Sequence, residues 1–158
     1  MRTIETASEL DAPADAVWSR VRTLAGVNAE LAPFVRMTAP RGMMERSLEE
    51  APLGQPIFAS YLLLFGFVPY DRHLLTLVRV EKGRGFVEES TSWTQRAWHH
   101  ERAIEPIGEG RCRLVDRVRM DPRLPFVAPV LERVVTAIFL HRHRHLRAQF
   151  GSRAAPLP

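Results

Sequence analysis

The sequence predicts an α+β domain in which an antiparallel sheet of six or seven strands packs against one long C-terminal helix. Two observations lead to this prediction. Between residues 57 and 121, segments rich in alternating apolar residues are separated by turns that contain glycine or proline. After Pro122 and Pro125 the apolar period changes from two to about 3.6, which is the period of a helix.

Composition places the chain among soluble globular proteins, since 46% of its 158 residues are hydrophobic and 25% are charged. We assign residues 1–151 to a single domain and expect 152–158 to be a disordered tail. Neither a secretory signal nor an apolar run of roughly 18 residues is present. The single Cys112 cannot form an internal disulfide. We therefore expect a cytoplasmic protein without stable membrane insertion.

The net charge of +4 does not indicate a nucleic-acid partner. Lys82 is the only lysine, and the arginines are scattered over every expected element instead of forming one groove. No aromatic strand motif or metal-finger spacing accompanies them. We expect no nucleic-acid partner and no cofactor, and no protein partner can be named from the sequence.

The N-terminal third predicts one strand and two short helices. A strand is expected at Ile4–Leu10, and a helix follows with Asp11 as candidate cap and Pro13 in its first turn. Gly26-Val27-Asn28 is expected to interrupt the helical pattern before a second short helix at 29–32.

An antiparallel meander is expected to follow a short strand at 34–38 and a loop-rich connection at 39–56, which contains a short strand around 44–48. The apolar run from Tyr61 to Phe67 is interpreted as buried strand. The strands expected in the meander are 57–67, 72–80, 86–92, 97–107 and 111–121.

The C-terminal helix is expected from Phe126 to Phe150, with Pro129 in its first turn, where a missing N–H costs little. At about 1.5 Å per residue it would be about 36 Å long, enough to cross a sheet. The apolar stripe expected to face the sheet consists of Val127, Val130, Leu131, Val134, Val135, Ile138 and Phe139.

The loop Gly108-Glu109-Gly110 fixes the register of the last two strands. It suits a three-residue hairpin with Gly110 in the left-handed conformation, which pairs Ile107 with Arg111. A two-residue loop would pair residues whose side chains point to opposite faces of the sheet, and the pleat does not allow such pairs. The cross-strand pairs that follow are Ile104–Leu114, Arg102–Asp116, His100–Val118 and Trp98–Met120.

This register directs charged side chains inward, because they share a face with apolar residues of the same strands. Such charges must pair with one another, with water or with a ligand, since an unpaired buried charge is very costly. The expected inner polar cluster consists of Glu88, Ser90, His100, Arg102 and Asp116.

The same residues carry a family resemblance. The motif is a phenylalanine followed two residues later by an acid, then tryptophan-x-histidine-x-histidine, an aspartate strand and a C-terminal helix with arginine. Here it consists of Phe86, Glu88, Trp98, His100, Asp116 and Arg142. The chain resembles the START-like or SRPBCC superfamily of polyketide cyclases and lipid-transfer domains, in particular a bacterial branch of small ligand-binding proteins.

Two positions depart from this pattern. Arg102 stands where the branch usually has a second histidine, and Trp93-Thr94-Gln95 replaces a common Gly-Pro-aromatic turn. The resemblance implies a helix-grip fold, in which a curved sheet wraps around the long helix and encloses an apolar ligand cavity.

We therefore expect the chain to bind a hydrophobic or lipid-like molecule with a polar end. The predicted ligand-binding residues are Phe86, Glu88, Ser90, Trp98, His100, Arg102, Asp116 and Arg142. One alternative is a polyketide aromatase/cyclase-like enzyme that uses His100, Asp116 and Arg102. Others are a purely structural network around the same charges, and a protein-interaction module whose cavity is filled.

Histidines at positions 141, 143 and 145 resemble a metal-binding run. On a helix only His141 and His145 share a face, and no third ligand is evident, so we predict no metal site. Continuing the apolar stripe places Arg142 near the sheet-facing side, where it could cap one mouth of the cavity.

Overall fold

A computed structural model describes residues 1–152 of the chain. Seven antiparallel strands form one sheet in the order β1-β7-β6-β5-β4-β3-β2. The strands are β1 (Arg2–Leu10), β2 (Val35–Met37), β3 (Pro56–Leu64), β4 (Val68–Glu81), β5 (Gly85–Ser92), β6 (Gln95–Pro106) and β7 (Cys112–Pro122). The helices are α1 (Ala14–Val21), α2 (Leu24–Leu31) and α3 (Ala128–Phe150), with short 3-10 turns η1 (Leu48–Glu50) and η2 (Pro125–Val127).

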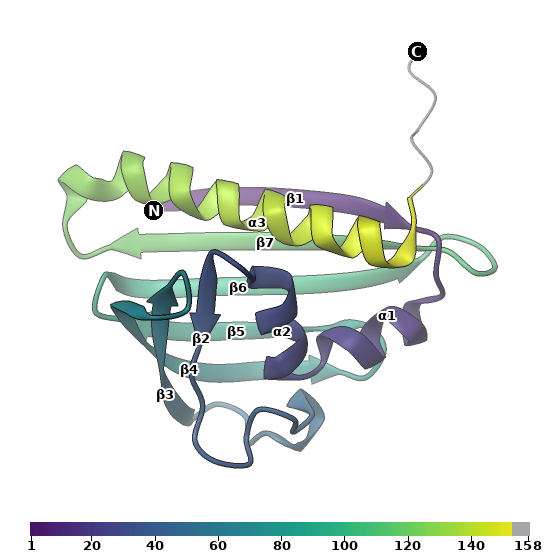
Figure 1. The fold of residues 1–158 in the computed structure, drawn as a ribbon, viewed down its shortest axis with the longest axis horizontal. Coiled ribbons are helices and arrows are strands. Elements are labelled where there is room, and N and C mark those ends of the chain that lie inside the picture. The colour runs from purple at the N-terminus through teal and green to yellow at the C-terminus, as the bar shows by residue number, and fades with distance from the viewer. Residues whose placement is uncertain (153–158) are drawn as a thin grey trace.

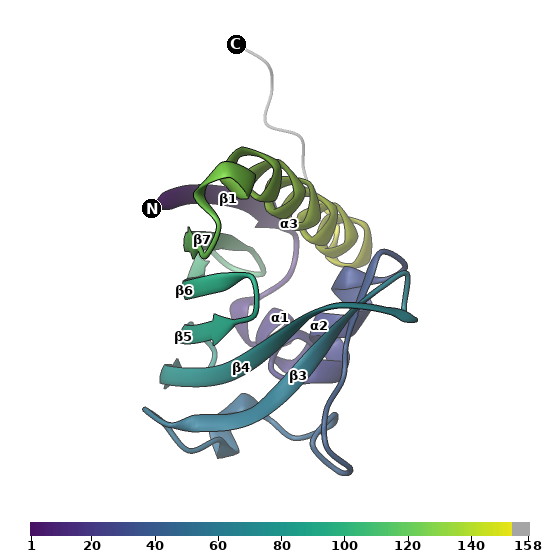
Figure 2. The ribbon, with the colours of Figure 1, turned by 90° about the vertical axis from the view of Figure 1, so that its left-hand side faces the viewer.

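The sheet curls into an arc. Figure 2 shows α3 along the β1 end of this arc, with α1 and α2 on its concave side. Figure 1 shows that α3 runs beside β1 and β7 for most of their length. This arrangement confirms the predicted helix-grip architecture. Residues 153–158, which make up nearly all of the expected disordered tail, lie outside the described residues.

The β6–β7 hairpin has the predicted register. Arg102 pairs with Asp116 and His100 with Val118, and the N–H of Ile107 donates to the carbonyl of Arg111 at 3.2 Å. Gly110 has a φ of 71°, the left-handed conformation that the three-residue loop requires. Arg102 and Asp116 therefore face one another on the inner side of the sheet.

The two short helices differ from the sequence prediction. Pro13, not Asp11, occupies the N-cap of α1 and makes no side-chain cap bond. Gly26, expected to interrupt the helical pattern, lies inside α2. The N–H of Gly26 donates to the side-chain oxygen of the N-cap residue Thr23 at 3.1 Å. A Cβ added at Gly26 would lie 1.9 Å from the carbonyl oxygen of Arg20. This glycine therefore permits a close approach between α2 and the end of α1.

The short strand expected around 44–48 is absent from the connection, which ends where β3 begins at Pro56. Ser47 forms only a single bridge with Thr23, and the 3-10 turn η1 follows. The apolar run after it is not buried strand throughout, because the chain reverses at Phe65, whose φ is 53°. Phe65 and Phe67 at this turn are 58% and 74% exposed. The prediction of a buried strand from Tyr61 to Phe67 was therefore wrong: the strand ends at Leu64, and Tyr61 and Leu64 are themselves 41% and 39% exposed.

The apolar stripe of α3 is only partly buried. Phe139 is buried, whereas Val130 and Val134 are 60% and 47% exposed, contrary to the expected sheet-facing position. The other members of the stripe, Val127, Leu131, Val135 and Ile138, are half-buried. The N-terminal half of α3 therefore does not pack closely on the sheet.

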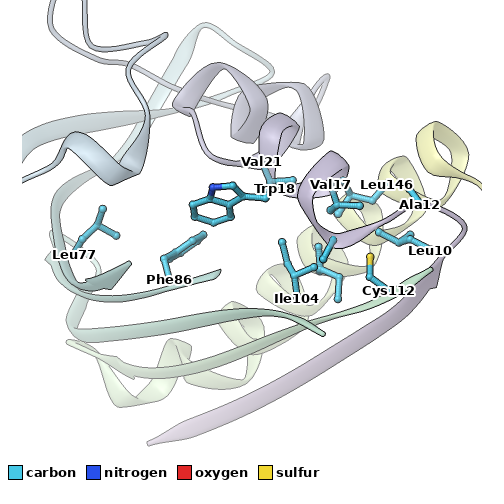
Figure 3. Packing of buried hydrophobic residues seen from close by; sticks show 12 residues of the cluster. Leu10, Ala12, Val17, Trp18, Val21, Leu77, Phe86, Ile104, Cys112 and Leu146 are labelled. Carbon is cyan, nitrogen blue, oxygen red and sulfur yellow. The ribbon is translucent and has the colours of Figure 1, made fainter. Parts of the chain in front are cut away.

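The core consists of two apolar clusters. The larger one joins α1 to one end of the sheet, and Trp18 reaches from α1 toward Phe86 within it (Figure 3). The smaller one, near the other end of β7, includes Val118, Met120 and Phe139. Between the two clusters lie the inward charges of β6 and β7. No helix within residues 1–152 has the length and apolar character needed to cross a membrane.

Candidate functional site: a cavity beside a buried ion network

A cavity of about 230 Å³ lies between the sheet, α2, the 39–56 connection and α3. It reaches the surface, since its lining includes the exposed Val134. Most lining side chains are apolar, among them Leu31, Phe58, Leu75, Leu77, Phe86, Trp98, Leu131, Val135, Ile138 and Phe139. The polar lining residues from the sheet, the β5–β6 turn and α3 are Tyr70, Asp71, His73, Glu88, Ser92, Thr94, Gln95, His100 and Arg142.

Arg102 is the centre of a buried ion network behind this lining. Its Nε and Nη2 donate to the two carboxylate oxygens of Asp116 at 2.8 and 2.7 Å. Its Nη1 and Nη2 donate to the carboxylate of Glu30 in α2 at 2.8 and 3.0 Å. All three side chains are almost completely buried. Each carboxylate therefore receives the paired, planar hydrogen bonds that guanidinium groups make best.

The network determines the ionisation of its carboxyl groups. Burial alone would raise the pKa of Asp116, but the Arg102 guanidinium holds that pKa well below its usual range. Burial likewise opposes ionisation of Glu30, and the charges of Arg102 and Arg142 lower its pKa. Both carboxyl groups are therefore ionised and paired in the folded protein.

His143 ties the network to β1. Its Nε2 forms a hydrogen bond with Asp116 Oδ2 at 2.9 Å, and its Nδ1 forms one with Ser8 Oγ at 2.8 Å. Ser8 Oγ also accepts a hydrogen bond from Arg147 Nη1 at 2.7 Å. Since an ionised carboxylate only accepts, Nε2 of His143 donates to Asp116. Both ring nitrogens of His143 are thus already used.

A second polar pair, His73 and Glu88, lines the cavity itself. Nε2 of His73 lies 2.5 Å from Glu88 Oε1, which also accepts from Ser90 Oγ at 2.6 Å. Burial alone would lower the pKa of His73, but the Glu88 charge raises it. Burial alone would raise the pKa of Glu88, but His73 and His100 lower it. The two side chains form a buried ion pair in contact with the cavity.

His100 links the two polar groups. Its Nε2 bonds Asp116 Oδ1 at 2.8 Å, and its Nδ1 lies 3.8 Å from Glu88 Oε2. Its ring packs edge-on against Phe86 and Phe139, with centroids 5.2 and 5.1 Å away. The imidazole is therefore held in place by carboxylates at both nitrogens and by aromatic rings.

Arg142 is the one member of the ion network on α3 that lines the cavity. Its Nε donates to Glu30 Oε2 at 2.8 Å, and its guanidinium lies 4.9 Å from the centroid of the Phe139 ring. Within residues 1–152, neither terminal nitrogen of Arg142 has a hydrogen-bond partner. The cavity therefore borders a fixed cation whose terminal donors are free.

Residues 8–150 match the family model described as Domain of unknown function (DUF8410). The chain belongs to the DUF8410 family. No curated protein matches the sequence of this DUF8410 chain.

Solved structures similar to the DUF8410 chain share its fold at low sequence identity. Protein CV1439 from Chromobacterium violaceum has a TM-score of 0.70 at 12% identity, covering 97% of this chain and 100% of its own. The Zhui aromatase/cyclase from Streptomyces sp. R1128 has a TM-score of 0.68 at 16% identity, with coverage of 94% and 92%. A START superfamily protein from Mycobacterium smegmatis has a TM-score of 0.64 at 12% identity, with coverage of 94% and 96%. The predicted START-like fold is confirmed.

The residues predicted from the sequence to bind ligand fall into two groups in the DUF8410 chain. Five of them line the cavity, namely Phe86, Glu88, Trp98, His100 and Arg142. Ser90, Arg102 and Asp116 do not line it, and each is hydrogen-bonded to other side chains. Of the inner polar cluster, Glu88 and His100 therefore line the cavity, whereas Ser90, Arg102 and Asp116 lie behind the lining residues.

Several members of the site were missed at the level of sequence. His73 and Asp71 lie on β4, where no motif marked them, and Glu30 lies on a helix that was expected to be shorter. His143 was excluded as a metal ligand because it does not share a helix face with His141 and His145. It lies one turn after Phe139 and is fully buried. The i to i+4 spacing from the apolar stripe was the signal that could have found it.

Proposed function

We propose that the chain binds a compact apolar molecule in this cavity, with the polar end of the molecule against His73, Glu88, His100 and Arg142. The observation that carries the proposal is Arg142, a buried cation at an apolar cavity whose terminal nitrogens have no hydrogen-bond partner among residues 1–152. Binding sites characteristically combine apolar walls with a few convergent polar groups. A carbonyl or other oxygen acceptor on the ligand would satisfy these donors.

The volume limits the size of the ligand. About 230 Å³ exceeds the roughly 150 Å³ that holds a benzene ring. It is below the roughly 300–1,000 Å³ of sites for drug-sized molecules. A ligand with one or two rings, or a short acyl chain, fits these limits, and a longer chain would have to extend past Val134 into solvent. The name of the similar Zhui structure, an aromatase/cyclase, also supports a small organic molecule as the ligand.

The cyclase-like alternative has weaker support. It needs His100 to exchange a proton with substrate, but carboxylates lie at both of its ring nitrogens. Arg102 and Asp116, the other residues of that alternative, do not line the cavity. The interaction-module alternative requires a filled cavity, and the void of about 230 Å³ argues against it.

Native mass spectrometry of gently purified protein, followed by organic extraction, tests the proposal. We expect a discrete co-purifying apolar compound, or uptake of one member of a panel of short fatty acids, aromatic ketones and phenols at a ratio of one to one. An unliganded mass together with no uptake from the panel would contradict the proposal and favour a structural role for the ion network.

A further inference from the structure

Gln95, at the first position of β6, has an unused side chain that lines the cavity. It is only 4% exposed, and its Oε1 is enclosed without a hydrogen-bond partner among the described residues. An unsatisfied buried polar atom costs about 1–3 kcal/mol, so nearly all such atoms in folded proteins are bonded. Within residues 1–152, no side chain satisfies this buried polar group.

A bulge directs Gln95 inward. Trp98 and His100 face the cavity, so simple alternation along β6 would turn Gln95 away from it. The pairing of β6 with β7 shifts between Gln95 and Ala97, which reverses the facing at this one position. The sequence pattern alone therefore could not identify Gln95 as a cavity residue.

The backbone of Gln95 is held by the β5–β6 turn. Its N–H donates to Ser92 Oγ at 3.0 Å, and Ser92 Oγ donates to Asp71 Oδ2 at 2.8 Å. Thr94 completes this arrangement with hydrogen bonds to both carboxylate oxygens of Asp71. The turn thus fixes the position of Gln95 without using its carboxamide.

The surroundings of Gln95 disfavour an anion. Asp71, which also lines the cavity, accepts hydrogen bonds only from hydroxyl and backbone N–H groups in the described part of the chain, and its charge helps to raise the pKa of the nearby His73. Burial and the Asp71 charge raise the pKa of Tyr70 to about 12. A carboxylate at this end of the cavity would meet the same negative potential.

We infer that Gln95 recognises a hydroxyl group on the ligand, so that the ligand is a compact apolar alcohol or phenol. A hydroxyl group can donate to Oε1 and accept from the amide nitrogen, and it brings no charge next to Asp71. The inference rests on the proposed function, because Gln95 lines the same cavity.

Isothermal titration calorimetry with 2-naphthol and 2-methylnaphthalene tests the inference, since the two probes are similar in size and differ in the hydroxyl group. We expect wild type to bind 2-naphthol about tenfold more tightly, as one satisfied buried acceptor implies. Gln95→Leu should keep its affinity for 2-methylnaphthalene and lose the preference for 2-naphthol. The control Gln149→Leu changes an exposed glutamine on α3 and should behave as wild type.

Each contrary outcome has a separate meaning. Equal affinity of wild type for both probes, or a preference that survives in Gln95→Leu, would overturn the inference and leave the proposed function standing. Tighter binding of 2-naphthoate or of a naphthylmethylammonium ion than of 2-naphthol would also overturn it, because the recognised group would then be charged. Failure of every naphthalene probe to bind wild type, together with no uptake from the mass-spectrometry panel, would reject both proposals.

Discussion

Arg102 is the residue on which the buried charges depend. Its guanidinium contacts two carboxylates on separate elements, Glu30 of α2 and Asp116 of β7. Removing one partner of a buried ion pair costs more than the pair contributes, because the remaining charge stays buried without compensation. The network therefore stabilises one arrangement of α2, α3 and the sheet relative to others.

Replacing Asp116 with asparagine should destabilise the protein by about 3–5 kcal/mol, the cost of breaking a buried ion pair. Asparagine preserves the shape but leaves Arg102 with one carboxylate in place of two. Urea denaturation measures the loss. The control Asp121→Asn removes a half-exposed carboxylate of the same strand, which pairs with Arg96 at 3.3 Å, and should change stability little. Equal effects of the two variants would contradict the importance of the network.

At the residue scale, the sequence predicted the parts of the site that follow strand periodicity. The Arg102–Asp116 pair and the inward Glu88 and His100 follow from a period of two and one hairpin loop. Gln95 could not be predicted in the same way, because a bulge reverses its facing. Ion pairing across 72 residues, as between Glu30 and Arg102, has no local signature at all.

At the element scale, α2 links the surface helices to the ion network. It presents Glu30 to Arg102 and Arg142, and it lies close to α1 where Gly26 meets the carbonyl of Arg20. The sequence rule that glycine interrupts helices failed here because packing of the two helices required a residue without Cβ. The hairpin and the long helix were predicted correctly because their signals are local.

Gly26→Ala should destabilise the protein overall, because the alanine methyl group would lie 1.9 Å from a backbone oxygen. The cost of this clash should exceed the stabilisation that alanine gains from its higher helix propensity. Overpacking of this kind costs about 1–3 kcal/mol. The comparison variant is Gly110→Ala, where no atom lies within 4 Å of the added methyl and only the left-handed conformation, at about 1–2 kcal/mol, opposes the change.

Thermal denaturation and intrinsic tryptophan fluorescence, measured in a background in which Trp93 and Trp98 are replaced by phenylalanine so that Trp18 alone reports, distinguish the two glycine variants. Gly26→Ala should alter the environment of Trp18, because α1 must shift relative to α2, whereas Gly110→Ala should not. Unchanged stability and fluorescence in Gly26→Ala would show that the two helices can separate at no cost and would contradict this account of α2.

At the scale of the whole molecule, the polar residues separate the two apolar clusters of the described residues from each other and form part of the cavity wall. The paired carboxyl groups have lowered pKa values, so their contribution to stability is present above the ordinary carboxyl pKa and is lost as the pH falls through the lowered values. His73 has a raised pKa, so its contribution is complete below about 6.5 and is lost as the pH rises through the raised value.

We therefore expect wild type to lose stability relative to His73→Gln as the pH rises above about 6.5, because glutamine can hydrogen-bond Glu88 but does not titrate. Urea denaturation of both proteins between pH 6 and 9 gives the difference in unfolding free energy at each pH. His145→Gln, a half-buried histidine on α3, serves as the control. A difference between wild type and His73→Gln that does not change with pH would contradict the ion pair.

Native mass spectrometry of Ile138→Trp beside Leu140→Trp tests the central claim most directly, that the ligand lies in the cavity. Ile138 lines the cavity, whereas Leu140 on the same helix is 51% exposed and does not line it. The account predicts that Ile138→Trp remains folded and loses the bound compound, while Leu140→Trp retains it at the wild-type ratio. Retention of the compound by folded Ile138→Trp would place the ligand elsewhere and contradict the account.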